Sequence, residues 1–297
     1  MTTLKDVQNK ISAVKKTRQI TKAMNMVAAS RLRGAQMKMD GFRPYASKFA
    51  EVLGSLAARA DQEASPLLVP KDEIKHIHLI LCTSDRGLCG GFNLNLIEKA
   101  ETLIEENKAK GVEISVTNFG KKGRDWCRKG KIPIADEHLG VVGSTFGFHV
   151  ASTTGKKMVE AYLDGTYDEV YIVYAAFVSM GRLAAGVKQI LPIPPIETGE
   201  TEAVAEDAPY TAEHLCEPSP AELLNELLPR NIYVQIYSAL LETSTSEHAA
   251  RMSAMDNATK ACNDMIEDLT LAYNKARQAA ITAELMDIVG GAEALRG

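Results

Sequence analysis

Apolar residues near the start of the chain recur with the spacing of a coiled coil. Residues 1–33 contain no glycine and no proline, and Thr3 lies three positions before Asp6, as in many helix starts. The apolar positions alternate in steps of three and four residues and shift once, giving Leu4, Val7, Ile11 and Val14, then Ile20, Met24 and Val27. This spacing predicts a helix that packs lengthwise against another helix.

The C-terminal part of the chain contains a longer run of the same kind. Residues 230–289 are sixty consecutive positions without glycine or proline, and as one helix they would span roughly 90 Å. Ser219, Pro220 and Glu222 form a typical helix start ahead of the run, and Gly290 with Gly291 should end it. Nine positions within it alternate in steps of four and three: Ala258, Cys262, Met265, Leu269, Ala272, Ala276, Ala279, Ala283 and Met286. Four consecutive heptads predict a second coiled-coil helix with a thin, alanine-rich seam.

Proline and glycine should interrupt both helices. In the first, Gly34, Gly41 and Pro44 should weaken or bend the helix before it resumes over residues 46–60. In the second, Pro229 removes one backbone donor and should kink or break the helix.

The middle of the chain has a different pattern. Residues 76–83 and 169–178 are apolar enough for buried strands, and residues 112–119 alternate as a strand does. Helical patterns lie between them at residues 94–110 (with Asn93 as N-cap), 121–129 and 150–163. Residues 189–196 are rich in proline, which allows only an edge strand. The order predicts an α/β domain with a largely parallel sheet.

These patterns predict the domain organisation. A compact domain of roughly 120 residues is only about 30 Å across, so it cannot cover a helix of roughly 90 Å. We therefore expect the two terminal helices to pair as an antiparallel coiled coil, a shaft beside the α/β domain. The predicted parts are an N-terminal shaft helix over residues 1–60, the α/β domain over 74–197, an acidic connection over 198–218 and a C-terminal shaft helix over 219–297.

Charge is distributed unevenly along the chain. Residues 1–60 contain twelve lysines and arginines against three acidic residues, a net +9, so the other residues carry −13 of the total −4. The basic segment could be a solvated helix face, a contact for an acidic partner, or a nucleic-acid arm. Against nucleic acid, no aromatic residue precedes Phe42.

One loop invites a chemical interpretation. The glycine-rich segment 84–93 lies between a predicted strand and helix, where nucleotide-binding loops occur, but it matches neither GxGxxG nor GxxxxGK[ST]. Asp85 with Asp136 and Glu137 could form an acid pair, although surface charge is the simpler interpretation. A structural turn or a protein contact is favoured over a nucleotide site, and no cofactor, metal or catalytic residue is expected.

Sequence features also bear on location. No signal peptide is predicted, because charges separate the apolar residues at the N-terminus, and the uncharged stretch 170–181 is too short to cross a bilayer. Cysteines are scattered and odd in number, with no zinc-site spacing, at Cys82, Cys89, Cys127, Cys216 and Cys262. A reducing, cytosolic compartment is the simplest interpretation.

Several segments together resemble the gamma subunit of the F-type ATP synthase. They are ITKAMNMVAASRLR at residues 20–33, SDRGLCGGFN at 84–93, EHAARMSAMDNAT at 247–259 and YNKARQAAIT at 273–282. The resemblance spans nearly the whole chain in the same order. It implies a non-catalytic central rotor shaft and a Rossmann-like domain without a nucleotide. It also implies that the shaft transmits rotation of the membrane c ring to the catalytic beta subunits, which couples proton flow to ATP synthesis.

The resemblance also implies partners and contacts. The partners would be three alpha and three beta subunits, the epsilon subunit and the c ring, at the cytoplasmic face of the bacterial inner membrane. Lys22, Met24 and Arg31 would lie near the acidic lever loop of beta. Arg251, Gln278 and Thr282 would contact the inner loops of alpha and beta. A hydrophobic sleeve would surround Ala279, Ile281, Leu285, Met286 and Ile288. Glu217 would lie near the c ring, and Asp85, Arg86, Gly87, Gly90 and Gly91 would form a structural loop or a subunit contact.

Two other classes of protein remain as alternatives. One is an α/β nucleotide-binding enzyme with helical appendages, and the other is a coiled-coil adaptor with a nucleic-acid arm. No paired-cysteine regulatory insert of the chloroplast type is present, so thiol control is not expected.

Overall fold

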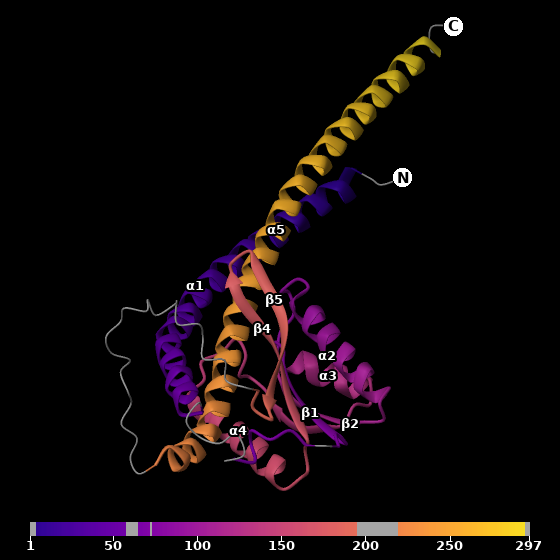
Figure 1. Cartoon of the computed structure of the whole chain (residues 1–297). Helices are drawn as coiled ribbons and strands as arrows, with labels where there is room; N and C mark the ends of the chain where they lie inside the picture. Colours follow the sequence, from indigo (N-terminus) through magenta and orange to yellow (C-terminus); the bar gives the residue numbers. More distant parts are fainter. Residues whose placement is uncertain (1–3, 58–64, 72, 195–218, 295–297) are drawn as a thin grey trace, which may run out of the picture. The chain divides into compact units, whose positions relative to one another are not determined.

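The computed structural model describes residues 4–57, 65–71, 73–194 and 219–294 (Figure 1). The helices are α1 (Leu4–Ala57), α2 (Phe92–Lys108), α3 (Lys121–Lys129), α4 (Phe148–Leu163) and α5 (Pro220–Ala294). The strands are β1 (His76–Cys82), β2 (Glu113–Phe119), β3 (Ile134–His138), β4 (Glu169–Ser179) and β5 (Arg182–Leu191). The predicted acidic connection over residues 198–218 lies outside the described residues.

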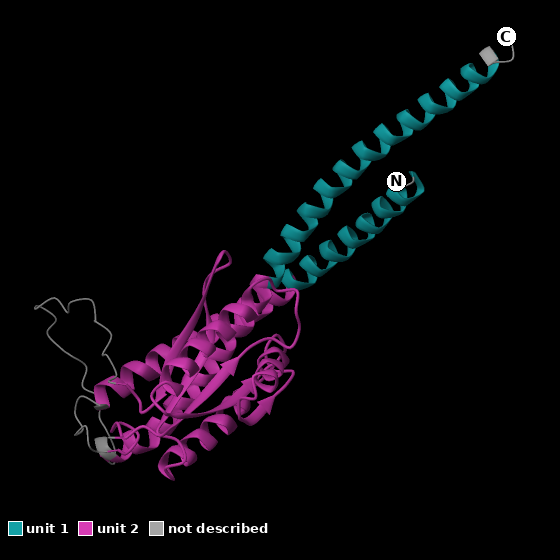
Figure 2. Cartoon of the chain, turned by 90° about the vertical axis from the view of Figure 1, so that its right-hand side faces the viewer, with its two compact units in different colours: residues 1–29, 251–297 teal, residues 30–250 magenta. Residues whose placement is uncertain are grey.

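The chain forms two compact units, and each draws on both terminal helices (Figure 2). Unit 1 contains Met1–Ala29 and Arg251–Gly297, and unit 2 contains Ser30–Ala250. Unit 1 therefore consists of helix alone in its described part, whereas unit 2 holds the sheet, three complete helices and the remaining parts of α1 and α5.

Unit 2 is built around a five-stranded sheet in the order β3-β2-β1-β4-β5. The pairs β1–β2, β1–β4 and β2–β3 are parallel, and only β4–β5 is antiparallel. This confirms the expected α/β domain with a largely parallel sheet. Strand β3 was not predicted, because its charged sequence IADEH resembles a loop. That sequence suits an edge strand, which pairs with β2 alone.

Helices cover both faces of this sheet. Alternate side chains of β1 point to opposite faces and pack against different helices. Leu79 and Leu81 pack in a core with α2 and α3, whereas Ile80 and Cys82 pack in a second core with α4 and with the unit 2 parts of α1 and α5. All four are fully buried. Each such side chain contributes roughly 1.5–3 kcal/mol of hydrophobic stabilisation.

Neither helix is broken at these prolines and glycines, although α5 changes direction near its start, as a kinked helix does (Figure 1). Helix α1 continues through Pro44 and both glycines, and α5 continues through Pro229 and through Gly290 and Gly291. Around Pro229, the neighbouring residues Leu228 and Ile232 are fully buried in the core. That packing offsets the roughly 3 kcal/mol that an interior proline costs. A glycine costs only about 1 kcal/mol relative to alanine and permits helical backbone angles.

Of two smaller predictions, the edge strand is present with different bounds and the helix cap was wrong. The edge strand predicted at residues 189–196 is β5, which begins at Arg182 because Met180 and Gly181 turn the chain back antiparallel to β4. Asn93 lies inside α2 and does not cap it, since Gly91 holds the N-cap position.

A buried histidine links β1 to β2. His78 Nδ1 lies 2.7 Å from Ser115 Oγ, and His78 Nε2 lies 2.9 Å from Thr117 Oγ1. Its ring stacks on Tyr167 at 4.3 Å between centroids. Burial lowers the pKa of His78 to about 4, so the imidazole is neutral near pH 7.

This histidine should make unit 2 sensitive to mild acid. The folded pKa lies below the ordinary value of 6.5, so unfolding takes up a proton between those values. Stability should be complete above pH 6.5 and should fall by roughly 3 kcal/mol as the pH drops to 4. Urea unfolding of the wild type and of His78→Gln at pH 7 and pH 4.5 measures this loss.

The variant should lose much less stability on acidification than the wild type does. Burial also lowers the pKa of His138, which is present in both proteins. His138 should therefore cause a smaller loss of stability in acid that the wild type and the variant have in common. Equal acid sensitivity of the two proteins would show that His78 is not the proton acceptor.

Candidate functional site

The described part of unit 1 is an antiparallel pair of helices, residues 4–29 of α1 and residues 251–294 of α5 (Figure 2). Three contacts define the pairing. Arg18 Nη1 donates to Asn263 Oδ1 at 3.1 Å, and the Thr259 hydroxyl lies 2.8 Å from that of Thr21. Asn25 Nδ2 donates to the backbone carbonyl of residue 252 at 2.8 Å. As the α1 number rises, its partner number falls, which confirms the antiparallel coiled coil expected from the sequence.

These polar contacts lie in the seam itself. The predicted Leu4, Val7, Ile11 and Val14 are all partly buried, but the seam continues through Arg18, Thr21, Asn25 and Ala28. The expected shift to Ile20 and Val27 was wrong, since those side chains are 60% and 55% exposed. Polar residues at seam positions stabilise a helix pair little, but they restrict it to one register.

The seam of α5 also differs from the predicted one. Ala258, Cys262, Leu269 and Ala276 are partly buried as expected. Met265 is 52% exposed, and Ala272, Ala279, Ala283 and Met286 are exposed too. Ile266, Tyr273 and Ala280 take their places. Since α5 carries apolar residues on two adjacent stripes, spacing alone could not decide which stripe faces α1.

Helix α5 extends beyond the start of α1 (Figure 2). Its last half-buried residue is Ala280, and all residues from 281 to 292 are exposed. This segment, the α5 tip, presents large apolar side chains to solvent: Ile281, Leu285, Met286, Ile288 and Val289. Monomeric soluble proteins seldom expose so many contiguous apolar groups, which is typical of an interaction surface.

The remaining predicted contact residues lie on both helices. In unit 1, Lys22 is exposed, Met24 and Arg251 are half-buried, and Gln278 is exposed. Thr282 is also exposed, and its hydroxyl donates to the carbonyl of residue 278 at 2.9 Å. Arg31 is exposed and belongs to unit 2. Glu217 lies outside the described residues.

The loop after β1 is a closed turn. Asn93 Oδ1 accepts from the Ser84 backbone N–H at 3.0 Å, and Asn93 Nδ2 donates to Ser84 Oγ at 2.8 Å. Cys89 is buried beneath it, 3.2 Å from Asn93 Nδ2. Arg86, Gly87, Gly90 and Gly91 are exposed around the outside, and Gly90 has a φ of 60°. These bonds support the predicted structural turn and explain why an asparagine follows the glycines.

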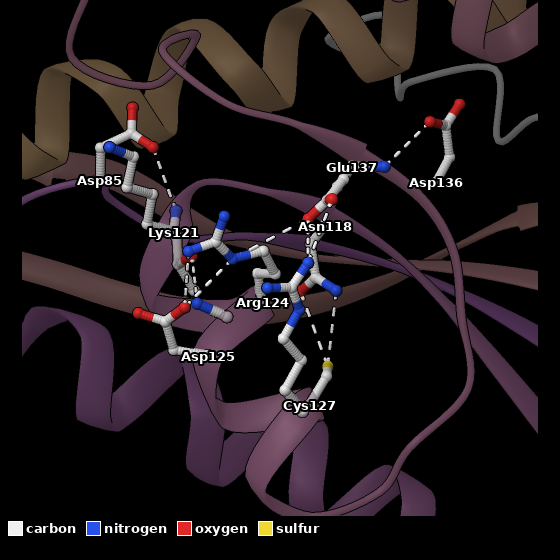
Figure 3. Close-up of polar contacts among 11 residues, drawn as sticks. Asp85, Asn118, Lys121, Arg124, Asp125, Cys127, Asp136 and Glu137 are labelled. Carbon is white, nitrogen blue, oxygen red and sulfur yellow. Dashed lines mark hydrogen bonds and ion pairs between the residues drawn. The ribbon is translucent and has the colours of Figure 1, made fainter.

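The backbone N–H groups in the first turn of α3 are hydrogen-bonded within the chain, and Figure 3 shows the contact between Asp85 and Lys121. Its first three backbone N–H groups donate in turn to Asp85 Oδ1 at 3.0 Å, to the Ser84 carbonyl at 3.1 Å and to Thr83 Oγ1 at 2.8 Å. Nucleotide-binding α/β domains use such N–H groups to hold phosphate. Here the Asp85 carboxylate takes the position that a phosphate oxygen would take. Asp85 Oδ2 also accepts from the Gly140 N–H at 2.8 Å, which joins the segment after β3 to the same carboxylate.

Asp136 and Glu137 do not form an acid pair with Asp85. Glu137 faces Arg124 at 3.8 Å (Figure 3) and Arg128 at 3.3 Å. Asp136 accepts from Lys157 at 2.6 Å. Burial alone would raise the pKa of Asp136, but the Lys157 hydrogen bond and the nearby His138 hold it below its ordinary value. Each carboxylate thus has its own cation, as in a surface ion-pair network.

Comparison with known proteins identifies the family. A family model described as ATP synthase matches residues 3–295. The ATP synthase gamma chain of Desulfosudis oleivorans is 62% identical over 298 residues, covering 100% of both chains. That of Nitratidesulfovibrio vulgaris strain Hildenborough is 53% identical over 297 residues, again covering 100% of both. The chain belongs to the ATP synthase gamma chain family.

Chains in solved ATP synthase structures share the fold of this protein. A chain of the Euglena gracilis mitochondrial ATP synthase, in an OSCP/F1/c-ring structure, gives a TM-score of 0.66 at 19% identity over 98% of this chain and 94% of that one. A chain of the Tetrahymena thermophila mitochondrial ATP synthase central stalk and c ring gives 0.56 at 22% identity over 80% and 99%. Among the residues described here, no helix is both long and apolar enough to span a membrane.

The turn before α3 should tolerate no side chain. Gly120 has a φ of +101°, and a Cβ there would lie 2.2 Å from the Thr83 carbonyl oxygen. Gly120→Ala should therefore cost roughly 3 kcal/mol or more of unfolding free energy. Gly111 also has a positive φ, +79°, but its Cβ would meet nothing within 4 Å, so Gly111→Ala should cost only about 1 kcal/mol. Denaturant unfolding of both variants compares the costs, and equal losses would refute the close contact.

The register of the helical pair can be tested by cross-linking. In a Cys262→Ser background, cysteines replacing Thr21 and Thr259 should form a disulfide on oxidation, because the two hydroxyls lie 2.8 Å apart. Cysteines replacing Ile20 and Thr259 should not, because Ile20 faces solvent. Peptide mapping after mild oxidation measures both. A cross-link through position 20 and none through position 21 would contradict the observed seam.

Proposed function

We propose that this chain is the central-stalk rotor subunit of an F-type ATP synthase. In that role it transmits rotation of the membrane c ring to the catalytic beta subunits, couples proton flow to ATP synthesis and contributes no catalytic residue. The observation that carries the proposal is the antiparallel pairing of residues 4–29 with residues 251–280, which leaves apolar side chains facing outward on both helices. Membership of the gamma chain family supports it.

The outward apolar residues are the reason to expect a surrounding collar. Ile20 and Val27 on α1, and Met265 and Leu271 on α5, are all more than half exposed. Covering the exposed part of each would add roughly 1–2 kcal/mol of hydrophobic stabilisation. Alpha and beta subunits around the pair would cover them, and the two helices would present different side chains on different sides.

Such asymmetry supplies a mechanism of coupling. A shaft shifts the conformations of its partners only if it contacts the alternative conformations differently. An unsymmetrical helical pair turning inside a threefold ring meets this condition, because each beta subunit faces a different side of the shaft at any moment. Rotation would then drive the three sites through states of different nucleotide affinity.

Individual contacts follow from this role. Lys22, Met24 and Arg31 would face the acidic lever loop of beta. Arg251, Gln278 and Thr282 would bind the inner loops of alpha and beta. The α5 tip and Ala279 would turn in a hydrophobic sleeve, for which the exposure of Ile281, Leu285, Met286 and Ile288 is the physical support. Glu217 would lie near the c ring.

The proposed assembly contains three alpha and three beta subunits, the epsilon subunit and the c ring, with this chain held peripherally at the cytoplasmic face of the bacterial inner membrane. The loop formed by Asp85, Arg86, Gly87, Gly90 and Gly91 would be a structural turn or would contact a neighbouring subunit. No observation favours a nucleotide-binding enzyme, because the loop 84–93 is closed by bonds between Ser84 and Asn93 and the first N–H groups of α3 are already bonded within the chain.

Co-purification provides the direct test of the assembly. A tagged version of this chain, isolated from mild detergent, should carry two nucleotide-binding subunits in threefold molar excess. The purified chain alone should neither hydrolyse ATP nor retain RNA or DNA at physiological salt. Recovery of the chain without those subunits, or ATP hydrolysis by the isolated chain, would contradict the proposal.

A substitution on α1 tests the coupling role. Met24→Lys should reduce proton-driven ATP synthesis more than ATP hydrolysis. The new cation would lie beside the beta carboxylates and strengthen a contact that must be transient, by about 1 kcal/mol or more. Met24→Leu, which adds no charge, is the control and should couple normally. Inverted membrane vesicles allow both activities to be measured, and unchanged coupling in Met24→Lys would remove Met24 from the proposed contact.

A further inference from the structure

Unit 2 contains a cavity of about 440 Å³, and of its lining residues only Arg31 has a place among the proposed rotor contacts. Its walls come from the unit 2 part of α1, from the loop between β3 and α4, and from the middle of α5. The polar lining residues are Arg31, Lys38, Ser144, Thr145, Ser244 and His248. Small-molecule sites typically measure roughly 300–1,000 Å³.

Two cations lie along one wall. Arg31 and Lys38 are seven residues apart on α1, so they share one helix face about 10 Å apart. Within the described ranges neither forms an ion pair with an acidic side chain. Between them lie Gly34 and Ala35, and a Cβ at Gly34 would meet nothing within 4 Å. The wall is therefore open between the two charges, where a longer side chain would fill the space.

Hydroxyl groups lie on the other walls. Ser244 Oγ accepts from the Gly143 N–H at 3.1 Å, which leaves its own proton to donate. Ser144 and Thr145 are exposed in the same loop. Gly143 has a φ of +78°, and a side chain there would meet Glu247.

None of the described side chains that line the cavity is acidic, and Glu247, which packs beside Gly143, lies against its neighbour His248. Glu247 Oε2 lies 3.0 Å from His248 Nδ1, and both side chains are almost fully buried. Glu247 is therefore buried away from the cavity, while Arg31 and Lys38 line it. The balance of charge at the opening favours an anion.

We propose that this cavity binds a small phosphorylated molecule. Its phosphate would lie between Arg31 and Lys38 and accept hydrogen bonds from Ser244 and Thr145, since charge-assisted contacts of this kind hold phosphate in many proteins. A phosphate alone would leave most of the volume empty. Phe146 and Leu241, which also line the cavity, provide an apolar wall for the organic part.

Binding to the purified full-length chain tests the site. Equilibrium dialysis against adenosine monophosphate, a phosphate with a flat organic group, should show saturable binding to one site per chain. Inorganic phosphate should compete more weakly, because it cannot use the apolar wall. Absence of saturable binding would overturn the proposal, and phosphate binding as tightly as the nucleotide would overturn the assigned role of the wall.

Matched variants separate the site from general effects of charge. Gly34→Glu places a carboxylate in the open space and should weaken binding at least about tenfold, whereas Gly34→Ala adds only a methyl group and should bind as the wild type does. Lys38→Gln should also weaken binding about tenfold. Lys48→Gln removes a cation of the same helix that pairs with Glu51 away from the cavity, and it should have no effect.

Circular dichroism should show unchanged helix content in all four variants, which keeps a loss of binding distinct from a loss of fold. Equal affinity of Gly34→Glu and Gly34→Ala would exclude the cavity as the site. Binding of an acidic peptide but not of the nucleotide, lost in Gly34→Glu, would also overturn the proposal and assign the cavity to a carboxylate-bearing protein. The test does not depend on the rotor role, because it requires no other subunit.

Discussion

The pairing of the two terminal helices depends on a seam that is polar where a coiled coil would ordinarily be apolar. Arg18, Thr21 and Asn25 occupy successive seam positions and bond across to α5. Hydrogen bonds of this kind contribute about 1 kcal/mol each, less than buried leucines would. Their geometry, however, fits only one register, so the seam gives up strength and gains a defined alignment. Because the seam is partly polar, some apolar side chains of both helices lie on the outside of the pair, where other proteins can cover them.

In the α/β part of the chain, the backbone N–H groups at the start of α3 are bonded to groups of the chain itself and are not open to a ligand. In this topology the ends of parallel strands and the start of the following helix form a natural anion site. Asp85 fills it from within and joins the first turn of α3 to the segment after β3. Gly120 makes this closure possible, because only a glycine fits against the Thr83 carbonyl. The position where related folds hold a nucleotide phosphate is thereby occupied by a side chain of the chain itself.

Much of this architecture could be predicted from local pattern. The β-α-β order was visible because buried strands are short, apolar and bounded by glycines, and α3 was predicted with its observed bounds. The antiparallel pair followed from the absence of glycine and proline over sixty residues, which no compact domain could cover. Strand β3 could not be predicted in this way, because an edge strand pairs on one side only and can carry the charges of IADEH. The site residues that came from resemblance, such as Arg251 and Gln278, have no signature in spacing or composition.

The sequence by itself determined that both ends of the chain are helical, that they must find partners along their length, and that a parallel α/β sheet lies between them. Those features depend on composition and period, which are properties of short stretches. Only the tertiary structure decided which of two apolar stripes on each helix faces inward, and that α1 and α5 continue through Pro44 and Pro229. It also decided that Asp85 bonds to α3. Each of these outcomes is set by contacts between residues far apart in the chain, whose energies of a few kcal/mol exceed the local preferences that a sequence pattern reports.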